Sequence, residues 1–252
     1  MEARTALAAP FGGEAFAPRE RTCTLYRLGC VPYGEALNLQ RELVERRRRG
    51  EIQDVLLLLE HPSVITLGRN ARRDHLLSST ETLKKEGIEL AETDRGGDIT
   101  YHGPGQLVGY PILDLSRIRK DVVWYVRTLE EALIRAARDF GFRAGRKEGM
   151  TGVWVGQAKV AAIGIHVSRW VTSHGFALNL ETDLGYFRHI VPCGITGCPV
   201  TSFRELLGAP VDRSLAEERM VQHLSELLGL ELRFGRPQSL ERERRDRCRS
   251  MC

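Results

Sequence analysis

The sequence predicts an α+β protein in which a mixed β-sheet is flanked by helices. Strand-like patterns cluster in the middle of the chain, and helical patterns lie between and after them. A regular alternation of strands and helices is missing, which argues against a doubly wound parallel fold. With 252 residues, 42% of them hydrophobic and 28% charged, the chain can bury a sizeable core.

Three segments differ in composition. Residues 1–20 mix Ala, Gly, Pro and charges without periodicity, so we expect a mobile N-terminal extension. Residues 21–235 carry the periodic segments and are expected to form a single domain. Residues 236–252 are Arg-rich without apolar periodicity, which predicts a frayed tail.

The first elements are a strand over Thr22–Leu28 and a helix over Tyr33–Arg49, which has Ala36, Leu37, Gln40, Leu43 and Val44 on one side. Arg46–Arg49 end this helix, where cations suit the helix dipole. Docking of an acidic partner is the alternative reading of the same four arginines.

The next elements come from apolar runs and cap signals. The continuous apolar run Asp54–Glu60 predicts a central strand covered on both faces. The elements predicted after it are a strand at Val64–Leu67, a short helix up to Gly87 opened by the capping box Ser78-x-x-Glu81, and a long strand at Leu107–Leu115.

The second half begins with the clearest helix of the chain, Asp121–Phe140, which Gly141 ends. Its stripe consists of Val122, Val126, Leu129, Leu133, Ala136, Ala137 and Phe140. The later elements are a hairpin of Gly152–Val155 and Ala158–Val167, a strand at His174–Leu180, and a last helix capped by Ser214-x-x-Glu217.

The stretch Arg95–Leu107 predicts a ligand-binding loop. It reads R-G-G-D-I-T-Y-H-G-P-G-Q-L, with one glycine turn before and one after the short strand Ile99–Tyr101. Glycines permit positive φ and let a bound molecule approach the backbone closely. An elaborate hairpin connection remains the alternative.

Lys159 is a candidate general base. Alternation within Ala158–Val167 places it on the face of Ala161, Ile163 and Ile165. Desolvation on an apolar face lowers the pKa of a lysine toward a value useful to a base. A lysine near a hairpin end that extends to water is an equal alternative.

Cys193 is a candidate nucleophile because it lies between Pro192 and Gly194, on a turn whose neighbours add little bulk. A small buried hydrophobe is the commoner role of a lone cysteine. Cys198 lacks such a setting and serves as the comparison. His174 opens a strand in His174-Gly175-Phe176, where it could orient a ligand or line a pocket.

Composition excludes several classes of function. A net charge of +4 is too small to indicate nucleic-acid binding, and no apolar run is long enough to span a membrane. The six cysteines form loose pairs, typical of reduced thiols in the cytoplasm. A metal site built from His102, His166, His174, His189 and Cys193 has no supporting ligand spacing, so we expect no metal.

Taken together, these segments closely resemble the lipoyl(octanoyl) transferase family. The matching motifs, in family order over roughly residues 22–230, are V31-P-Y-G-E-A-L37 with Gln40, E60-H-P-S-V-I-T-L-G-R69, R95-G-G-D-I-T-Y-H-G-P-G-Q-L-V-G-Y110, G156-Q-A-K159, A162-I-G164, H174-G-F176 and P192-C-G194 followed by T201-S202. The resemblance implies the fold of biotin and lipoate protein ligases. It also implies octanoyl transfer from octanoyl acyl carrier protein to a lysine of lipoyl domains, those of 2-oxoacid dehydrogenase complexes and the glycine cleavage H protein.

The resemblance also assigns roles to residues. It implies a catalytic dyad of Cys193 and Lys159 and no cofactor. The implied substrate-binding residues are Arg95, Gly96, Gly97, Asp98, Ile99, Thr100, Tyr101, His102, Ala162, Ile163, Gly164, His174, Gly175 and Phe176. Backbone N–H groups near Ala162–Gly164 or in the glycine-rich loop are the candidate donors to an oxyanion.

Two alternatives of the same fold remain. An ATP-dependent lipoate or biotin ligase would bind an acyl-adenylate in the glycine-rich loop and has no need of Cys193. A non-catalytic acyl-binding module would have no need of either Lys159 or Cys193.

Overall fold

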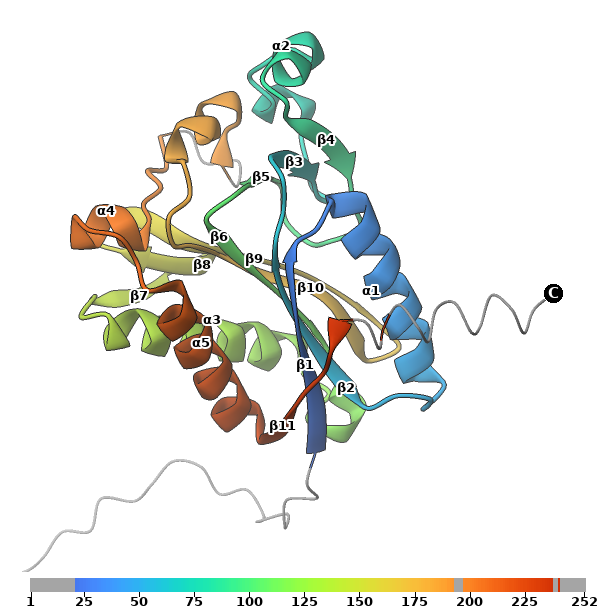
Figure 1. The fold of residues 1–252 in the computed structure, drawn as a ribbon. Helices are drawn as coiled ribbons and strands as arrows, with labels where there is room; N and C mark the ends of the chain where they lie inside the picture. The colour runs from blue at the N-terminus through green and yellow to red at the C-terminus, as the bar shows by residue number, and fades with distance from the viewer. Residues whose placement is uncertain (1–20, 193–196, 238–239, 241–252) are drawn as a thin grey trace, which may run out of the picture.

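The computed structural model describes residues 21–192, 197–237 and 240. The expected extension at 1–20, most of the expected tail at 236–252, and Cys193 lie outside these residues. The main element is an eight-stranded sheet with the order β11-β1-β2-β6-β10-β9-β8-β7 (Figure 1). Its strands are β1 (Arg21–Cys30), β2 (Asp54–Glu60), β6 (Gln106–Ile112), β7 (Ala144–Lys147), β8 (Met150–Val155), β9 (Ala158–Ser168), β10 (Val171–Asn179) and β11 (Leu230–Phe234).

The sheet is mixed, as the sequence predicts. β1 runs parallel to both β2 and β11, and the remaining neighbours are antiparallel. β2 is buried on both faces, because Leu56 and Leu58 pack into one core cluster while Val55, Leu57 and Leu59 pack into another. The expected central strand is therefore confirmed with the predicted bounds.

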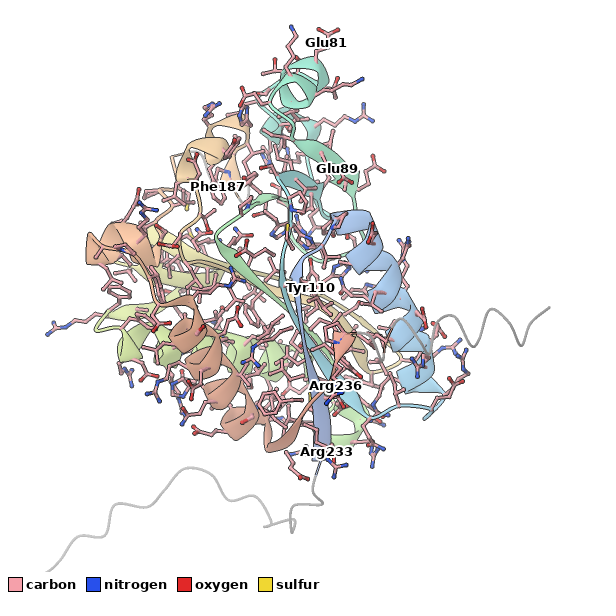
Figure 2. The ribbon with its side chains drawn as sticks, viewed as in Figure 1. Glu81, Glu89, Tyr110, Phe187, Arg233 and Arg236 are labelled. Carbon is pink, nitrogen blue, oxygen red and sulfur yellow. The ribbon has the colours of Figure 1, made fainter. Side chains whose placement is uncertain are left out.

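Helices cover the two faces of this sheet (Figures 1 and 2). α3 (Val122–Asp139) and α5 (Arg213–Leu228) pack on one face, and α1 (Tyr33–Arg48) packs on the other. The apolar stripe of α3 supplies much of the larger core, including Leu129 and Leu133, which have no exposed surface. Since both faces are covered, the sheet forms the rigid base on which the candidate site is built.

A second, three-stranded sheet lies beside one end of the main sheet. It has the order β4-β3-β5, formed by β4 (Glu89–Glu92), β3 (Val64–Leu67) and β5 (Ile99–His102). α2 (Thr80–Lys85) packs next to it, at the top of Figure 1. The remaining short helices are α4 (Phe203–Leu207) and the 3₁₀ segments η1 (Arg73–His75), η2 (Leu115–Arg117) and η3 (Leu184–His189). Sequence patterns predicted the bounds of β3 but did not show that this strand belongs to a second sheet.

Several predicted boundaries are wrong, among them the start of β10, which lies at Val171 instead of His174. α2 is capped by Ser79, whose side chain accepts from Thr82 N–H, while Ser78 bonds to His189. α5 is capped by Asp212 instead of Ser214, because a carboxylate there accepts from Leu215 N–H. β6 ends at Ile112 and the chain turns into η2, so the strand is shorter than Leu107–Leu115 implied.

The arginines at the end of α1 are largely used inside the fold. Arg46 and Arg47 are buried, and Arg47 Nε donates to Asp54 Oδ1 at 2.7 Å. Arg48 donates to the Ser168 carbonyl oxygen at 3.1 Å. Arg49 pairs with Glu51. The alternative that all four arginines form a docking site is wrong, because two of them are not accessible.

Candidate active site

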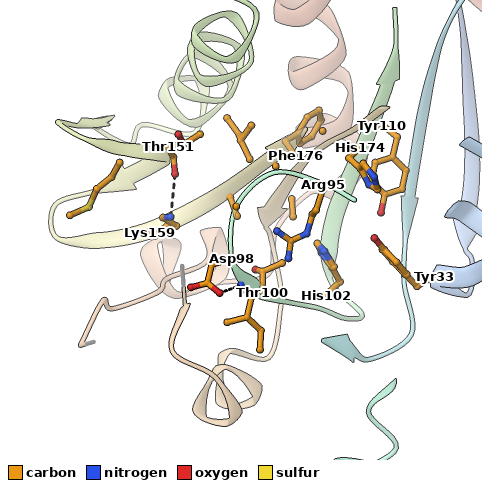
Figure 3. Close-up of a pocket in the computed structure, with 18 of the residues that line it drawn as sticks. Tyr33, Arg95, Asp98, Thr100, His102, Tyr110, Thr151, Lys159, His174 and Phe176 are labelled. Carbon is orange, nitrogen blue, oxygen red and sulfur yellow. Dashed lines mark hydrogen bonds between the residues drawn. The ribbon is translucent and has the colours of Figure 1, made fainter. Parts of the chain in front are cut away.

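The glycine-rich loop between β4 and β5 lies over the main sheet and lines a pocket of about 420 Å³ (Figure 3). Pockets of this size accommodate small ligands and acyl groups. The lining residues are Tyr33, Arg95, Gly97, Asp98, Ile99, Thr100, His102, Tyr110, Gly149, Met150, Thr151, Lys159, Ala162, Ile163, Gly164, His174, Gly175, Phe176 and Ala177.

Two contacts fix the loop to its surroundings. The buried guanidinium of Arg95 donates to the Thr66 hydroxyl and, at 2.7 Å, to the Thr66 carbonyl oxygen on β3. Gly96 N–H donates to the Ile165 carbonyl oxygen of β9 at 2.8 Å. A Cβ on Gly164 would lie 2.8 Å from the Gly96 carbonyl oxygen, so glycine is needed where loop and strand meet.

Asp98 holds the loop to the preceding segment. Its carboxylate accepts from the backbone N–H of Ile99 at 2.8 Å and of Arg72 at 3.2 Å, and it pairs with the His75 ring. The Asp98 carboxylate therefore holds the loop in place through these bonds, in addition to lining the pocket.

His61 and His102 are buried and neutral. Burial lowers the pKa of His102 to about 3 and that of His61 to about 4. His61 Nδ1 lies 2.6 Å from the Val31 carbonyl oxygen, which can only accept, so that nitrogen carries the proton. His61 Nε2 then accepts from the Tyr110 hydroxyl at 2.7 Å. Neither ring is suited to hold a positive charge near neutral pH.

His174 has an uncommon backbone conformation, with φ of 56° in a non-glycine residue. Its N–H donates to Gln40 Oε1 at 2.7 Å, and its Nε2 lies 2.9 Å from Asp94 Oδ1. Burial lowers the pKa of His174, and the bond to Asp94 opposes this shift. This positive φ interrupts the alternation of side chains along β10. Backbone strain of this kind concentrates at functional sites.

Lys159 lies on a different face from the one predicted. β8 and β9 pair Trp154 with Lys159 and Val153 with Ala161, which leaves Val160 as an extra residue in β9. Val160 and Ala161 both pack into the core with α3, whereas Lys159 lines the pocket together with Ala162 and Gly164. A β-bulge of this kind reverses the alternation. The expected grouping of Lys159 with Ala161, Ile163 and Ile165 is therefore wrong.

Lys159 is buried, with 5% of the residue exposed. Its Nζ donates to the Thr151 carbonyl oxygen at 3.2 Å (Figure 3). The same atom lies 4.6 Å from the centre of the Trp154 ring. The alternative of a lysine that extends to water is thus wrong.

A smaller cavity joins Lys159 to the segment around residue 193. Its lining includes Lys159, Asn179, Pro192 and Val200. Lys159 N–H donates to the Pro199 carbonyl oxygen at 2.8 Å, and Thr201 N–H donates to the Lys159 carbonyl oxygen at 2.9 Å. Described residues on both sides of 193–196 therefore lie beside Lys159: Pro192 lines the same cavity, and Pro199 and Thr201 bond to its backbone. Cys193 itself is outside the described part.

Two predicted binding residues do not line the pocket. The Tyr101 ring packs in a separate core cluster and stacks on Tyr186 at 5.1 Å. Gly96 contributes backbone contacts only. Sequence reasoning missed six lining residues, because the patterns of their helix and strands do not show which side chains face the loop. These residues are Tyr33, Tyr110, Gly149, Met150, Thr151 and Ala177.

Cys198 is partly exposed. Within the described ranges, no cluster of three or more His, Cys, Asp or Glu side chains is placed to hold a metal ion. In the same ranges, no helix is long and apolar enough to cross a membrane.

Comparison with known proteins identifies the family. Residues 32–225 match the model of the lipoyl protein ligase A/B catalytic domain. An octanoyltransferase from Solibacter usitatus is 53% identical over 215 residues, covering 85% of this chain and 97% of the relative. One from Koribacter versatilis is 58% identical, covering 72% of this chain and 74% of the relative. The chain belongs to the lipoyl protein ligase A/B catalytic-domain family and, within it, to the lipoyl(octanoyl) transferases.

Solved structures show the same fold. A lipoate-protein ligase A bound with ATP superimposes with a TM-score of 0.71 at 20% identity, covering 88% of this chain and 93% of that one. A bipartite lipoate protein ligase from Thermoplasma acidophilum gives a TM-score of 0.70 at 20% identity, covering 89% and 92%. The predicted fold class is confirmed.

Proposed function

We propose that this protein is an octanoyltransferase that moves an octanoyl group from octanoyl acyl carrier protein to a lysine of a lipoyl domain. The acceptors are the lipoyl domains of 2-oxoacid dehydrogenase complexes and the glycine cleavage H protein. The reaction takes place in the cytoplasm through a thioester on Cys193. The pocket beside the buried Lys159 is the observation that carries this proposal.

The position of Lys159 supports its role as the base. The side chain lines the acyl-sized pocket and also the small cavity that Pro192 lines, one residue before Cys193. The other described end of that segment, Pro199 to Thr201, is bonded to the Lys159 backbone. A lysine placed between the two cavities can serve both halves of an acyl transfer.

In the first half-reaction, Lys159 takes the proton of the Cys193 thiol and the thiolate attacks the thioester carbonyl. The bond to the phosphopantetheine sulfur breaks, and that sulfur receives the proton from Lys159. In the second half-reaction, Lys159 takes a proton from the acceptor amine, which attacks the Cys193 thioester. The bond between the acyl carbon and Cys193 Sγ breaks as the amide forms, and the proton on Lys159 passes to the departing Cys193 sulfur. A thioester donor is already activated, so no ATP is needed.

In this proposal the neutral His102 lines the pocket, and the neutral His61 supports it through its bond to the lining residue Tyr110. His102 and His61 have pKa values lowered to about 3 and about 4, so neither is charged at neutral pH. The backbone N–H groups of Ala162–Gly164 and of the glycine-rich loop are the candidate donors to the tetrahedral oxyanion.

Intact-mass analysis after mixing with octanoyl acyl carrier protein tests the proposal. We expect one octanoyl adduct without nucleotide, mapped to Cys193 by peptide analysis and absent in Cys193→Ala. Cys198→Ala is the matched control and should retain the adduct. An adduct that appears only with ATP would favour an ATP-dependent ligase, and an adduct on Cys198 would contradict the assigned nucleophile.

A further inference from the structure

The buried carboxylate of Glu130 is connected to the Lys159 side chain through a single peptide unit. Glu130 lies on α3 and has no exposed surface. Its Oε1 accepts from Gly152 N–H at 3.1 Å. The carbonyl oxygen of the same peptide unit, that of Thr151, accepts from Lys159 Nζ at 3.2 Å. Carboxylate, peptide and amine thus form one continuous hydrogen-bonded chain.

The conformation of Gly152 permits this close approach. Its φ is 129°, a value that residues with a side chain rarely adopt. A Cβ at this position would lie 2.6 Å from the Ala161 carbonyl oxygen and 3.3 Å from Lys159 Cε. Glycine is therefore required for the peptide to reach both the lysine and the carboxylate.

The two oxygens of Glu130 have different partners. Oε2 accepts from Arg127 at 2.7 Å and from Arg146 at 2.9 Å, whereas Oε1 faces Gly152. The side chains of Arg127 and Arg146 are 52% and 34% exposed, so water screens the cations more than the carboxylate. A buried charge polarises the groups bonded to it more strongly than a solvated one.

We propose that Glu130 is a positioning residue that acts on Lys159 through the Thr151–Gly152 peptide. The inference rests on the proposed function, in which Lys159 is the base. The Thr151 carbonyl oxygen and the face of the Trp154 ring are both electron-rich, so they attract N–H groups and repel a lone pair. The lone pair of the neutral amine is thereby directed elsewhere.

The same chain acts during proton transfer. The S–H bond of Cys193 breaks, a new N–H bond forms at Lys159, and positive charge develops on Nζ. The Thr151 carbonyl, polarised by Glu130, stabilises that charge until the proton passes to the leaving sulfur. The effect parallels the stabilisation of a protonated base by a buried carboxylate in hydrolase triads.

The test compares Glu130→Gln with Glu131→Gln. Glu131 is the neighbouring carboxylate on α3 and also bonds Arg146, at 2.9 Å, but its other bond goes to Arg135. Octanoyl-adduct formation is followed by single-turnover mass analysis, which gives a rate constant and an amplitude separately. We expect the rate constant to fall roughly tenfold in Glu130→Gln, the effect of weakening one charge-assisted hydrogen bond. The amplitude should stay near that of the parent, and Glu131→Gln should match the parent in both.

Two results would overturn the inference. One is an unchanged rate constant in Glu130→Gln. The other is a loss of amplitude alone, which indicates a purely structural role. If Glu130→Gln does not fold, the double variant Glu130→Gln/Arg146→Gln removes the carboxylate together with one of its cations. A parental rate constant in that variant would equally contradict the inference.

Lys159→Ala, measured alongside, separates this inference from the proposed function. If Lys159→Ala reacts as fast as the parent, the assignment of the base fails and the role of Glu130 fails with it. If Lys159→Ala is slow while Glu130→Gln and Glu131→Gln both match the parent, only the inference about Glu130 fails.

Discussion

Gln106 and Asn179, which lie 73 residues apart in the chain, are joined by a buried hydrogen bond of 2.9 Å from Gln106 Nε2 to Asn179 Oδ1. Asn179 Nδ2 in turn donates to the Thr201 carbonyl oxygen at 3.0 Å, and Gln106 Oε1 faces His102 Nδ1 at 2.7 Å. Because the Thr201 carbonyl oxygen can only accept, the direction of every bond in the chain is determined. His102 therefore carries its proton on Nδ1, and the pocket is tied to the segment after residue 196.

The first prediction concerns Asn179→Leu, which keeps the side-chain size but removes both bonds. It leaves a Gln106 N–H and the Thr201 carbonyl oxygen unpaired, and each orphaned buried group costs about 1–3 kcal/mol. We expect a lower free energy of unfolding in urea and slower adduct formation. Asn38→Leu on the exposed side of α1 is the control and should change little. Equal stability of the two variants would show that this buried chain of bonds does not hold the segment.

The second prediction concerns stability at acid pH. The pKa of His61 is lowered to about 4 and that of His102 to about 3, below the value of 6.5 for the unfolded chain. The unfolded state therefore binds more protons below pH 6.5. The contribution of these two neutral histidines to the free energy of unfolding is fully present above that pH. It is lost as the pH falls toward 4 and then 3. Each histidine should lower the free energy of unfolding by about 1–2 kcal/mol between pH 7 and pH 5.

Urea unfolding at several pH values in this range measures how the free energy of unfolding changes with pH. His61→Gln should show a smaller loss of unfolding free energy at acid pH than the parent, because one of the buried titrating histidines is gone. A slope equal to that of the parent would contradict a neutral, buried His61.

The third prediction is that Lys159, and not a histidine, sets the reactivity of Cys193. Lys159→Ala should slow iodoacetamide alkylation of Cys193 and both half-reactions. Lys159→Arg should not rescue them, since a guanidinium cannot accept a proton. His102→Ala and His174→Ala are the comparison, with alkylation rates mapped by peptide mass analysis across pH. Fast alkylation in Lys159→Ala together with slow alkylation in either histidine variant would reverse the assignment.

The fourth prediction concerns the docking of the proposed donor, octanoyl acyl carrier protein, which we expect to be acidic. Arg69 and Arg73 are exposed and lie on the segment that Asp98 ties to the pocket loop. Charge reversal at both should raise KM for octanoyl acyl carrier protein and reduce its salt dependence. Arg49→Glu, at the C-terminal end of α1, is the matched control because that side chain is also exposed. If neither variant alters the salt dependence, electrostatic docking at this segment is wrong.

Much of the secondary structure could be predicted because it depends on local periodicity. The apolar run of β2 and the stripe of α3 give their elements within a residue. Cap positions are less certain, as Ser78, Ser79 and Thr80 are adjacent and only the backbone geometry selects Ser79. β4, β7 and β11 were missed. They are short, with few fully buried side chains, and are held by pairing with their neighbours.

The candidate site was partly predictable for the same reason. Glycines and polar groups concentrated in Arg95–Leu107 indicate a binding loop, and the family motifs indicate Lys159 and Cys193. Which residues face the pocket depends on contacts between distant strands. The extra residue Val160 reverses the side of Lys159, and Tyr101 turns into a core cluster of its own.

The sequence by itself determined the family and the class of fold and indicated candidate residues for the chemistry, because these are written as local motifs and periodicities. Tertiary structure decided the face of Lys159, the separate three-stranded sheet and the link from Glu130 through Gly152. Each of these depends on strand pairing or on contacts between segments far apart in the chain. Such contacts depend on two segments at once, so neither segment alone encodes them.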